Sequence, residues 1–319
     1  MNATRVGPAL DRRTFLRGMV GWGGALMLAG CSGEEPGDAA AVVNTVPDRD
    51  RLGIQLHTVR DVLAADFRGT LSRLAEIGYR EVEPTDYGGM TPVEFRAALD
   101  DVGLTAPSTH ASVVLGPELE ERLAGYQLIG HRYSRANPVL PGTSPDNPPP
   151  ATVETWQRRA AAYNEIGEIA RPYGIRIIIH NHTAEFRYLE GTTLRPFDIL
   201  LAETEPELVA WQLDIGWSSV AGMDAVQLFH DHPGRFVSWH VKDVSGLRAL
   251  SGELSIEERR QATSMARIGE GDIDWPAIVA HANISGVEHI FVEIEGEAVA
   301  DGSIEASAAA FRYLSGIVI

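Results

Sequence analysis

The sequence of 319 residues has one cysteine and one lysine, whereas arginine occurs 26 times. A single cysteine excludes a disulfide framework, a cysteine-based zinc finger and an iron–sulfur cluster. No apolar run reaches the ~18–20 residues that a membrane-spanning helix needs, which excludes a polytopic membrane protein. Acidic residues outnumber basic ones by 44 to 27, and the formal charge of −17 argues against nucleic-acid binding because phosphate backbones would be repelled.

The first thirty residues have the features of an export signal. Arg12 and Arg13 form a twin-arginine pair, and a weakly apolar run over residues 18–30 follows them. This run is too short to span a bilayer but suits the hydrophobic core of a signal peptide. Cys31 follows Leu-Ala-Gly, which resembles a bacterial lipobox. We therefore predict twin-arginine export, cleavage after residue 30 and lipidation of Cys31. The mature protein is then a lipoprotein of the cell envelope that meets the membrane only through this anchor.

Loss of residues 1–30 would remove four arginines and one aspartate, leaving 23 basic and 43 acidic side chains and a charge of −20. Residues 31–50 are small, polar and acidic, a composition typical of a flexible tether. We predict one folded domain over residues 51–319.

Within this domain a glycine followed by a short apolar or β-branched run recurs, which is typical of a helix end followed by a buried strand. These runs begin at Gly53, Gly78, Gly103, Gly174 and Gly286, and residues 208–213, 236–239 and, more weakly, 126–133 are further strand candidates. Amphipathic stretches over residues 62–77, 153–170 and 303–314 predict helices between them.

About eight strands alternating with helices over ~265 residues favour a single (β/α)₈ TIM barrel over an open doubly wound sheet. No G-x-G-x-x-G or Walker-type loop is present, which weakens nucleotide-binding alternatives. Residues 141–150 are rich in proline and predict a loop, and the polar residues 245–270 predict a long excursion after the seventh strand.

Four of the expected strands end in a side chain that can bind a metal, and these are His180, Asp214, His240 and Glu293. The carboxyl ends of barrel strands converge on one mouth, where the active sites of such barrels lie. Two imidazoles and two carboxylates form a ligand set that suits Mn²⁺, Zn²⁺, Fe²⁺ or Co²⁺. We therefore predict one divalent-metal site at this mouth.

Residues two apart on a strand share a face, so other polar side chains accompany the ligands into the mouth. His182 follows His180 in this way, and Lys242 follows His240. On the first three strands the corresponding pairs are Gln55 with His57, Glu81 with Glu83 and Ser108 with His110. Lys242 is the only lysine in an arginine-rich chain, which indicates a need for a compact ammonium group.

These segments resemble a known family. The motifs are His180-Asn181-His182-Thr183-Ala184-Glu185-Phe186, Leu213-Asp214-Ile215-Gly216-Trp217, His240-Val241-Lys242-Asp243 and the run from Gly269 to Trp275. Together they resemble the sugar phosphate isomerase/epimerase family, the xylose isomerase-like TIM barrels, over about residues 51–316. The resemblance implies one divalent metal, with Mn²⁺ expected and Zn²⁺, Co²⁺, Fe²⁺ or Mg²⁺ as alternatives, held by His180, Asp214, His240 and Glu293.

The resemblance also implies a sugar isomerase or epimerase that abstracts a proton next to a carbonyl through a metal-stabilised enediolate. Glu293 is then ligand and base together, and His182 or Lys242 protonates or holds the oxyanion. Trp217 is expected to cover the apolar face of the sugar. Further substrate contacts are expected from Glu83, His110 and His57.

One position departs from the family pattern, because many members carry glutamate where this chain has His180. This departure removes one of the two glutamates that a symmetrical exchange of protons needs. Glu185 is a candidate for the second acid/base group. Alternatively, the enzyme removes one proton and expels a leaving group, which is dehydratase or lyase chemistry.

Two other classes of protein remain on the same barrel. A non-catalytic carbohydrate-binding lipoprotein would fit the export signal but not a complete ligand quartet. A metal-dependent endonuclease would need a basic groove for DNA, which the negative charge does not support. The sequence leaves the exact substrate and the oligomeric state open.

Overall fold

The computed structural model describes residues 51–140 and 151–317. The export signal, Cys31, the tether and the proline-rich loop predicted above lie outside these residues. Within the part of the chain that is described, none of the helices has the length and apolar character required to cross a membrane.

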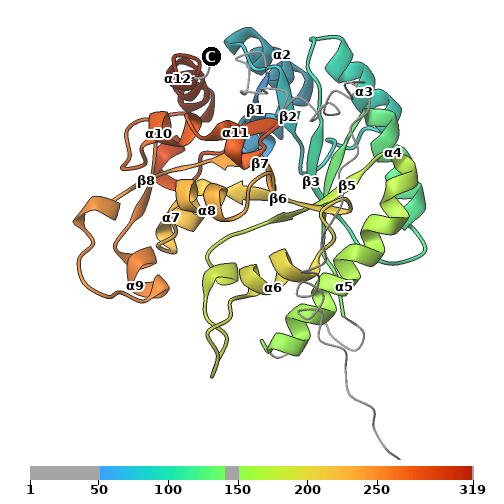
Figure 1. The fold of residues 1–319 in the computed structure, drawn as a ribbon. Coiled ribbons are helices and arrows are strands. Elements are labelled where there is room, and N and C mark those ends of the chain that lie inside the picture. The colour runs from blue at the N-terminus through green and yellow to red at the C-terminus, as the bar shows by residue number, and fades with distance from the viewer. Residues whose placement is uncertain (1–50, 141–150, 318–319) are drawn as a thin grey trace, which may run out of the picture. The chain divides into compact units, whose positions relative to one another are not determined.

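Eight strands form one parallel sheet in the order β2-β1-β10-β7-β6-β5-β4-β3 (Figure 1). They are β1 (Leu52–Gln55), β2 (Glu81–Glu83), β3 (Ser108–Val113), β4 (Tyr133–Ala136), β5 (Arg176–His180), β6 (Val209–Asp214), β7 (Phe236–Val241) and β10 (His289–Val292). The sheet closes between β2 and the chain entering β3, where the Val82 amide donates to Thr105 over 2.8 Å and the Thr105 amide donates to Arg80 over 3.0 Å. The predicted eight-stranded barrel is thereby confirmed.

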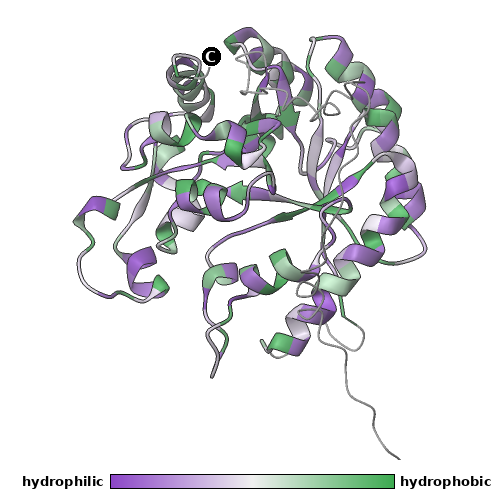
Figure 2. Cartoon of the chain, in the orientation of Figure 1, coloured by the Kyte–Doolittle hydropathy of each residue, from purple (hydrophilic) through white to green (hydrophobic). Residues whose placement is uncertain are grey.

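Helices follow the strands along the chain and cover the outside of the barrel (Figure 1). They are α1 (Arg60–Leu63), α2 (Phe67–Ile77), α3 (Pro92–Asp100), α4 (Leu119–Ile129), α5 (Val153–Ala170), α6 (Pro196–Glu203), α7 (Ile215–Val220), α8 (Ala225–Asp231), α9 (Ile256–Gln261), α10 (Trp275–Val279), α11 (Ala282–Ser285) and α12 (Ser303–Leu314). Short 3₁₀ turns lie at η2 (Leu56–Val59), η3 (Arg171–Tyr173), η4 (Ala184–Phe186), η5 (Leu247–Ala249) and η6 (Gly296–Val299). Hydrophobic and hydrophilic residues alternate along α5 (Figure 2), as expected for a helix with one buried face.

Two of the three predicted helices, over residues 153–170 and 303–314, are confirmed as α5 and α12. The third, over residues 62–77, is divided into α1 and α2. Asp66 lies between them and its carboxylate accepts from the Gly69 amide, so it caps the second helix.

The weak strand candidate over residues 126–133 is wrong, because its first half belongs to α4 and only Tyr133 belongs to a strand. Leu119, Leu123, Tyr126 and Ile129 recur at helical spacing and are all buried against the barrel, so the helix continues to Ile129. Gly130 then ends the helix with φ of +99°, and the strand β4 begins only at Tyr133.

The strand expected to begin near Gly103 starts later, at Ser108. Within the expected run, Thr105 already pairs with Glu81 across the closure of the barrel, but Pro107 has no amide to donate to a ladder. The predicted excursion over residues 245–270 carries η5 and α9. Its ends form an antiparallel ribbon of β8 (Asp243–Ser245) and β9 (Ser264–Ala266), and no residue of α9 is buried.

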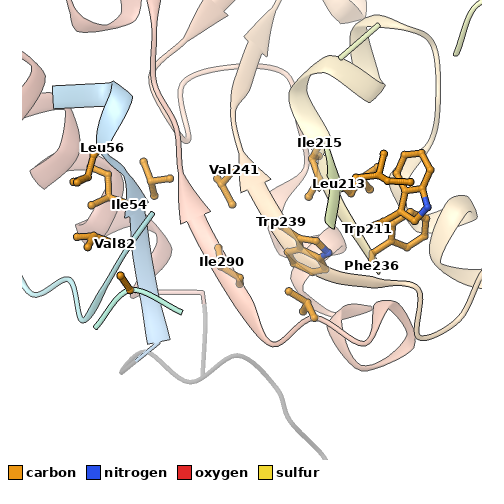
Figure 3. Packing of buried hydrophobic residues seen from close by; sticks show 14 of the residues in the cluster. Ile54, Leu56, Val82, Trp211, Leu213, Ile215, Phe236, Trp239, Val241 and Ile290 are labelled. Carbon is orange, nitrogen blue, oxygen red and sulfur yellow. The ribbon is translucent and has the colours of Figure 1, made fainter. Parts of the chain in front are cut away.

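The two faces of the barrel sheet differ in polarity. Outward-facing residues such as Ile54, Trp239 and Ile290 belong to the large apolar core between sheet and helices (Figure 3). The interior carries apolar side chains such as Phe291 but also polar ones, and one example is a buried pair of Glu81 and His289 with 2.8 Å between Oε2 and Nδ1. A parallel barrel with a polar interior has the means to build a site at its carboxyl end.

Candidate metal centre

The four predicted ligands occupy the carboxyl ends of four neighbouring strands. His180 and Asp214 are the last residues of β5 and β6, His240 is the penultimate residue of β7, and Glu293 follows β10. Asp214 and His240 are register partners on their two strands. All four side chains are buried.

The ligand atoms fall into two groups of three that share His240. Asp214, His240 and Glu293 form one group, and His110, His180 and His240 form the other, with all ligand atoms in each group within 4.8 Å of one another. The structure therefore brings the predicted quartet to one end of the barrel as two overlapping triads. His110, predicted only as a substrate contact, lies in ligand position beside His180.

His240 is the centre of this arrangement. Its Nδ1 lies 2.7 Å from Glu293 Oε2 and its Nε2 lies 2.6 Å from Glu83 Oε2. Burial opposes a charge on the imidazole, but the two carboxylates outweigh it and raise the pKa of His240 to about 9. Without a metal, both ring nitrogens therefore carry a proton and donate to the two carboxylates.

Glu83 lies behind His240 rather than in the open mouth. Its side chain is 0% exposed, and Oε1 accepts from Ser108 Oγ over 2.5 Å and from Gln212 Nε2 over 2.8 Å. Burial by itself would raise the pKa of Glu83, but the neighbouring His110 and His240 outweigh this effect and lower the pKa to about 2. Because its oxygens are already bonded inside the barrel, the carboxylate is in position to orient His240.

Lys242 places its ammonium among three carboxylates. Nζ lies 3.3 Å from Asp214 Oδ2, 3.1 Å from Glu293 Oε2 and 3.0 Å from Glu295 Oε1. Burial by itself would lower the pKa of Lys242, but the negative charges of the three carboxylates outweigh this effect and raise the pKa above its usual value. Burial raises the pKa of Asp214, whereas for Glu293 burial is overcome by His240 and Lys242, which hold its pKa well below the usual value.

Sequence reasoning missed Glu295 and Gln212. Glu295 bonds the ammonium of Lys242, and Gln212 joins Glu83 to His110, whose Nε2 is 2.9 Å from Gln212 Oε1. Each lies two residues from a predicted ligand, at Glu293 or Asp214. The rule that pairs residues two apart on a strand therefore held a signal for both.

His180 is buried without any hydrogen bond to its imidazole ring. Both of its ring nitrogens are buried and have no hydrogen-bond partner, and burial, then the neighbouring rings of His240 and His110, hold the pKa of His180 well below 6.5. Asp214 Oδ2 has no hydrogen bond, and its partner is the ammonium of Lys242 at 3.3 Å. Buried imidazole nitrogens without a partner, beside buried carboxylates, are the ligands that a divalent ion takes, so the residues fit a metal.

Three further residues predicted for the site, His182, Trp217 and Glu185, lie close to the candidate ligands or to one another. His182 and Trp217 lie at the mouth, where the His182 ring is 5.0 Å from that of His180 and 5.9 Å from that of Trp217. Lys242 Nζ is 5.4 Å from the Trp217 ring. Glu185 is half-buried in η4 and accepts from the His182 amide over 2.8 Å.

His57 lies beyond the end of the first strand. The strand β1 ends at Gln55, and His57 lies in η2, so the two-residue alternation that placed it in the mouth no longer applies. Gln55 itself does reach the site, because its Nε2 is 3.3 Å from His110 Nδ1.

Two motifs of the resemblance, the segment after His240 and the run from Gly269, meet in the structure. The Asp243 carboxylate accepts from the amides of Gly269 and Gly271 and from Trp275 Nε1, at 2.8, 3.2 and 3.1 Å. A side chain on Gly271 would collide with Asp243 Oδ1 at 2.2 Å. Asp243 therefore anchors the end of the excursion beside the strand that carries His240 and Lys242.

The fold and the ligand groups define a TIM barrel with a metal-type site at the carboxyl ends of its strands. The profile of the xylose isomerase-like TIM barrel family matches residues 71–314, and the chain belongs to that family. This confirms the resemblance seen in the sequence.

Proteins similar to this chain in sequence include inosose dehydratases. The one from Lacticaseibacillus casei is 27% identical over 181 residues, which cover 53% of this chain and 57% of the relative. The one from Bacillus licheniformis is 33% identical over 95 residues, which cover 29% of each chain. The chain thus matches about half the length of the first of these relatives.

Solved structures share the fold. A sugar phosphate isomerase/epimerase from Parabacteroides distasonis superposes with a TM-score of 0.67 at 22% identity, covering 85% of this chain and 96% of the other. The IOLI protein, solved with a bound zinc atom, superposes with a TM-score of 0.61 at 15% identity, covering 84% and 98%. At these identities the likeness extends to the fold alone.

Proposed function

We propose that this protein is a divalent-metal-dependent enzyme that isomerises or epimerises a sugar by removing the proton next to a carbonyl. The observation that carries the proposal is the pair of ligand groups that share His240, in which His180 has two ring nitrogens without a hydrogen-bond partner. The ligand atoms of Asp214 and Glu293 belong to one group, and that of His180 belongs to the other. A binding protein would have no need for such a buried ligand set. Mn²⁺ is our expected metal, and Zn²⁺, which the similar IOLI structure contains, is the first alternative.

The ligands in this proposal are His180, Asp214, His240 and Glu293. A bound divalent ion would supply Lewis acidity toward the carbonyl and the adjacent hydroxyl of the sugar. Glu83 would hold His240 through its Nε2–H and leave Nδ1 on the side of Asp214 and Glu293.

The chain's own groups would then move the proton. Glu293 is ionised because its pKa is depressed, so it is able to accept the proton α to the carbonyl. The ammonium of Lys242 lies beside Glu293 and is held there by the carboxylates of Asp214, Glu293 and Glu295. It would donate a hydrogen bond to the substrate oxygen on which negative charge develops. Trp217, beside Lys242 and His182, would cover the apolar face of the sugar.

A second candidate, dehydration, is favoured by two observations. The strand-five ligand is His180 rather than a glutamate, which removes one of the two opposed carboxylates of a symmetrical proton exchange. The relatives named above are inosose dehydratases. In this case Glu293 would remove the proton, and a protonated neighbour such as Lys242 or His182 would assist departure of the β-hydroxyl as water.

One experiment separates the three possibilities. The metal-loaded protein is incubated in D₂O with a panel of keto-sugars and keto-polyols and followed by proton NMR. Isomerisation or epimerisation gives a new sugar with deuterium at the former C–H position, whereas dehydration gives an unsaturated carbonyl compound with ultraviolet absorbance. A protein that binds these compounds but exchanges no proton would overturn the proposal in favour of carbohydrate binding.

A further inference from the structure

A polar cavity of about 390 Å³ lies directly beside the metal centre. Its lining includes His180, Glu185, Arg135 at the end of β4, and Arg159 and Tyr163 from α5. Two larger cavities, of about 410 and 730 Å³, share no lining residue with the two ligand triads. Of these three cavities, all lined by described residues, only the polar one reaches a candidate metal ligand.

The helix α5 presents one face to this cavity. Trp156, Arg159 and Tyr163 recur at intervals of three and four residues and all line it. The Arg159 guanidinium lies 4.7 Å from the centroid of the Trp156 ring, which holds the arginine in place. By contrast, Arg158 immediately precedes Arg159 in the chain but is exposed and does not line the cavity.

The two arginines of the cavity lack acidic partners. Among the described residues, neither Arg135 nor Arg159 forms an ion pair, and Arg159 Nε is buried without any hydrogen-bond partner. A chain with a formal charge of −17 offers many carboxylates, so two guanidinium groups without an ion pair to any described residue are not explained by packing alone. A buried donor of this kind calls for an acceptor that a ligand supplies.

The charge of the cavity indicates the charge of that ligand. Two arginines and the carboxylate of Glu185 leave one net positive charge, which a monoanion neutralises. A phosphate group carries about −1.5 to −2 at neutral pH and would leave an excess of negative charge. Burial raises the pKa of Tyr163 to about 12, so its hydroxyl stays protonated and is available as a further donor.

We propose that this cavity binds the carboxylate of an acidic sugar, through Arg135 and Arg159, while the reacting carbons of the same molecule lie toward His180 and the metal centre. The planar guanidinium is suited to paired hydrogen bonds with a carboxylate. This inference rests on the proposed function, because it names the substrate class as sugar acids, such as uronates and their keto derivatives.

Binding is tested by calorimetry on the full-length protein with D-glucuronate, D-glucose and D-glucose 6-phosphate, before and after removal of metal with a chelator. We expect glucuronate to bind at least about tenfold more tightly than glucose, because its carboxylate adds one or two charge-assisted hydrogen bonds that glucose lacks. The preference should fall to within about threefold in Arg135→Gln and in Arg159→Gln. The matched control Arg158→Gln should keep the full preference.

Folding of each variant is checked by circular dichroism and thermal melting, and Arg159→Lys, which keeps the charge and loses the fork, should retain part of the preference. Equal binding of glucose and glucuronate by the wild-type protein would overturn the inference. So would an unchanged preference in both glutamine variants, or tighter binding of glucose 6-phosphate than of glucuronate. The readout is independent of turnover, so a protein that selects glucuronate but exchanges no proton would refute the proposed function and leave this inference standing.

Discussion

His240 Nε2 lies 2.6 Å from Glu83 Oε2, although the two residues are 157 positions apart and sit on strands β7 and β2, which are separated by two other strands in the sheet. The contact crosses the interior of the barrel. It leaves Nδ1 of the same ring on the side of Glu293, so the buried carboxylate on β2 decides which nitrogen of His240 faces the candidate metal ligands.

Metal binding should release a proton from His240. The pKa of this residue is raised to about 9, so the ring is protonated at pH 7, whereas a metal ligand must offer a free nitrogen. We expect the affinity for Zn²⁺ or Mn²⁺ to rise about tenfold per pH unit below pH 9 and to level off above it. Calorimetry at pH 7 in two buffers of different ionisation enthalpy should report about one proton released per metal. An affinity that is constant from pH 6.5 to 9 would contradict this assignment.

The substitution Glu83→Gln should weaken metal binding by about 10–100-fold, because the amide orients His240 less firmly than a carboxylate does. The measurement is competition with a chelator of known affinity. Glu81→Gln is the matched control, since Glu81 lies two residues earlier on the same strand and bonds His289 instead. That control should lower the free energy of unfolding and leave the metal affinity unchanged. An equal loss of affinity in both variants would argue for a general structural effect.

The substitution Glu293→Gln should retain measurable metal but lower exchange of the α-proton in D₂O by about 10²–10⁴-fold, because the amide still offers an oxygen and cannot accept a proton.

Glu185→Gln should block isomerisation while exchange through Glu293 persists, if Glu185 is the second acid/base group. The exposed Glu190 provides a control in Glu190→Gln. If Glu185→Gln changes only the KM of a dehydration reaction, the second candidate function is favoured.

The interior of the barrel leaves no room for a side chain at Gly53. A Cβ there would lie 2.6 Å from the ring of Phe291, which fills the space opposite on β10. We expect Gly53→Ala to lower the free energy of unfolding by about 1–3 kcal/mol through overpacking. Gly116→Ala, where no atom lies within 4 Å of the new Cβ, should have little effect. Chemical denaturation of both variants measures the difference.

Export is tested in cells that have a twin-arginine pathway. Replacement of Arg12 and Arg13 by lysine should keep the protein out of the envelope fraction, and Cys31→Ser should give an exported protein that no longer sediments with membranes. Cell fractionation followed by immunoblotting checks both outcomes. Membrane association that survives the double lysine variant would refute the twin-arginine route.

The alternation of helices and strands predicted the barrel, and the polar residue at the end of four apolar runs predicted the side chains that now meet at its mouth. Both patterns are local. A parallel strand buried on both faces is mostly apolar, so an ionisable residue at the end of an apolar run is visible in the sequence itself. The alternation assumed that His57 continues β1, but β1 stops at Gln55 and the chain turns into η2, a change that local patterns did not mark.

The amino-acid sequence by itself determined the class of fold, the family and four of the five candidate ligands, because each depends on residue type and on local spacing along the chain. Only the tertiary structure decided their partners. Glu83 forms a hydrogen bond with His240, and His110 lies in one ligand group with His180. Arg135 and Arg159, the latter on the separate helix α5, line the same cavity. These pairs join distant parts of the chain across the barrel or over its rim, and such contacts are fixed by the closure and register of the whole sheet rather than by any segment of the sequence.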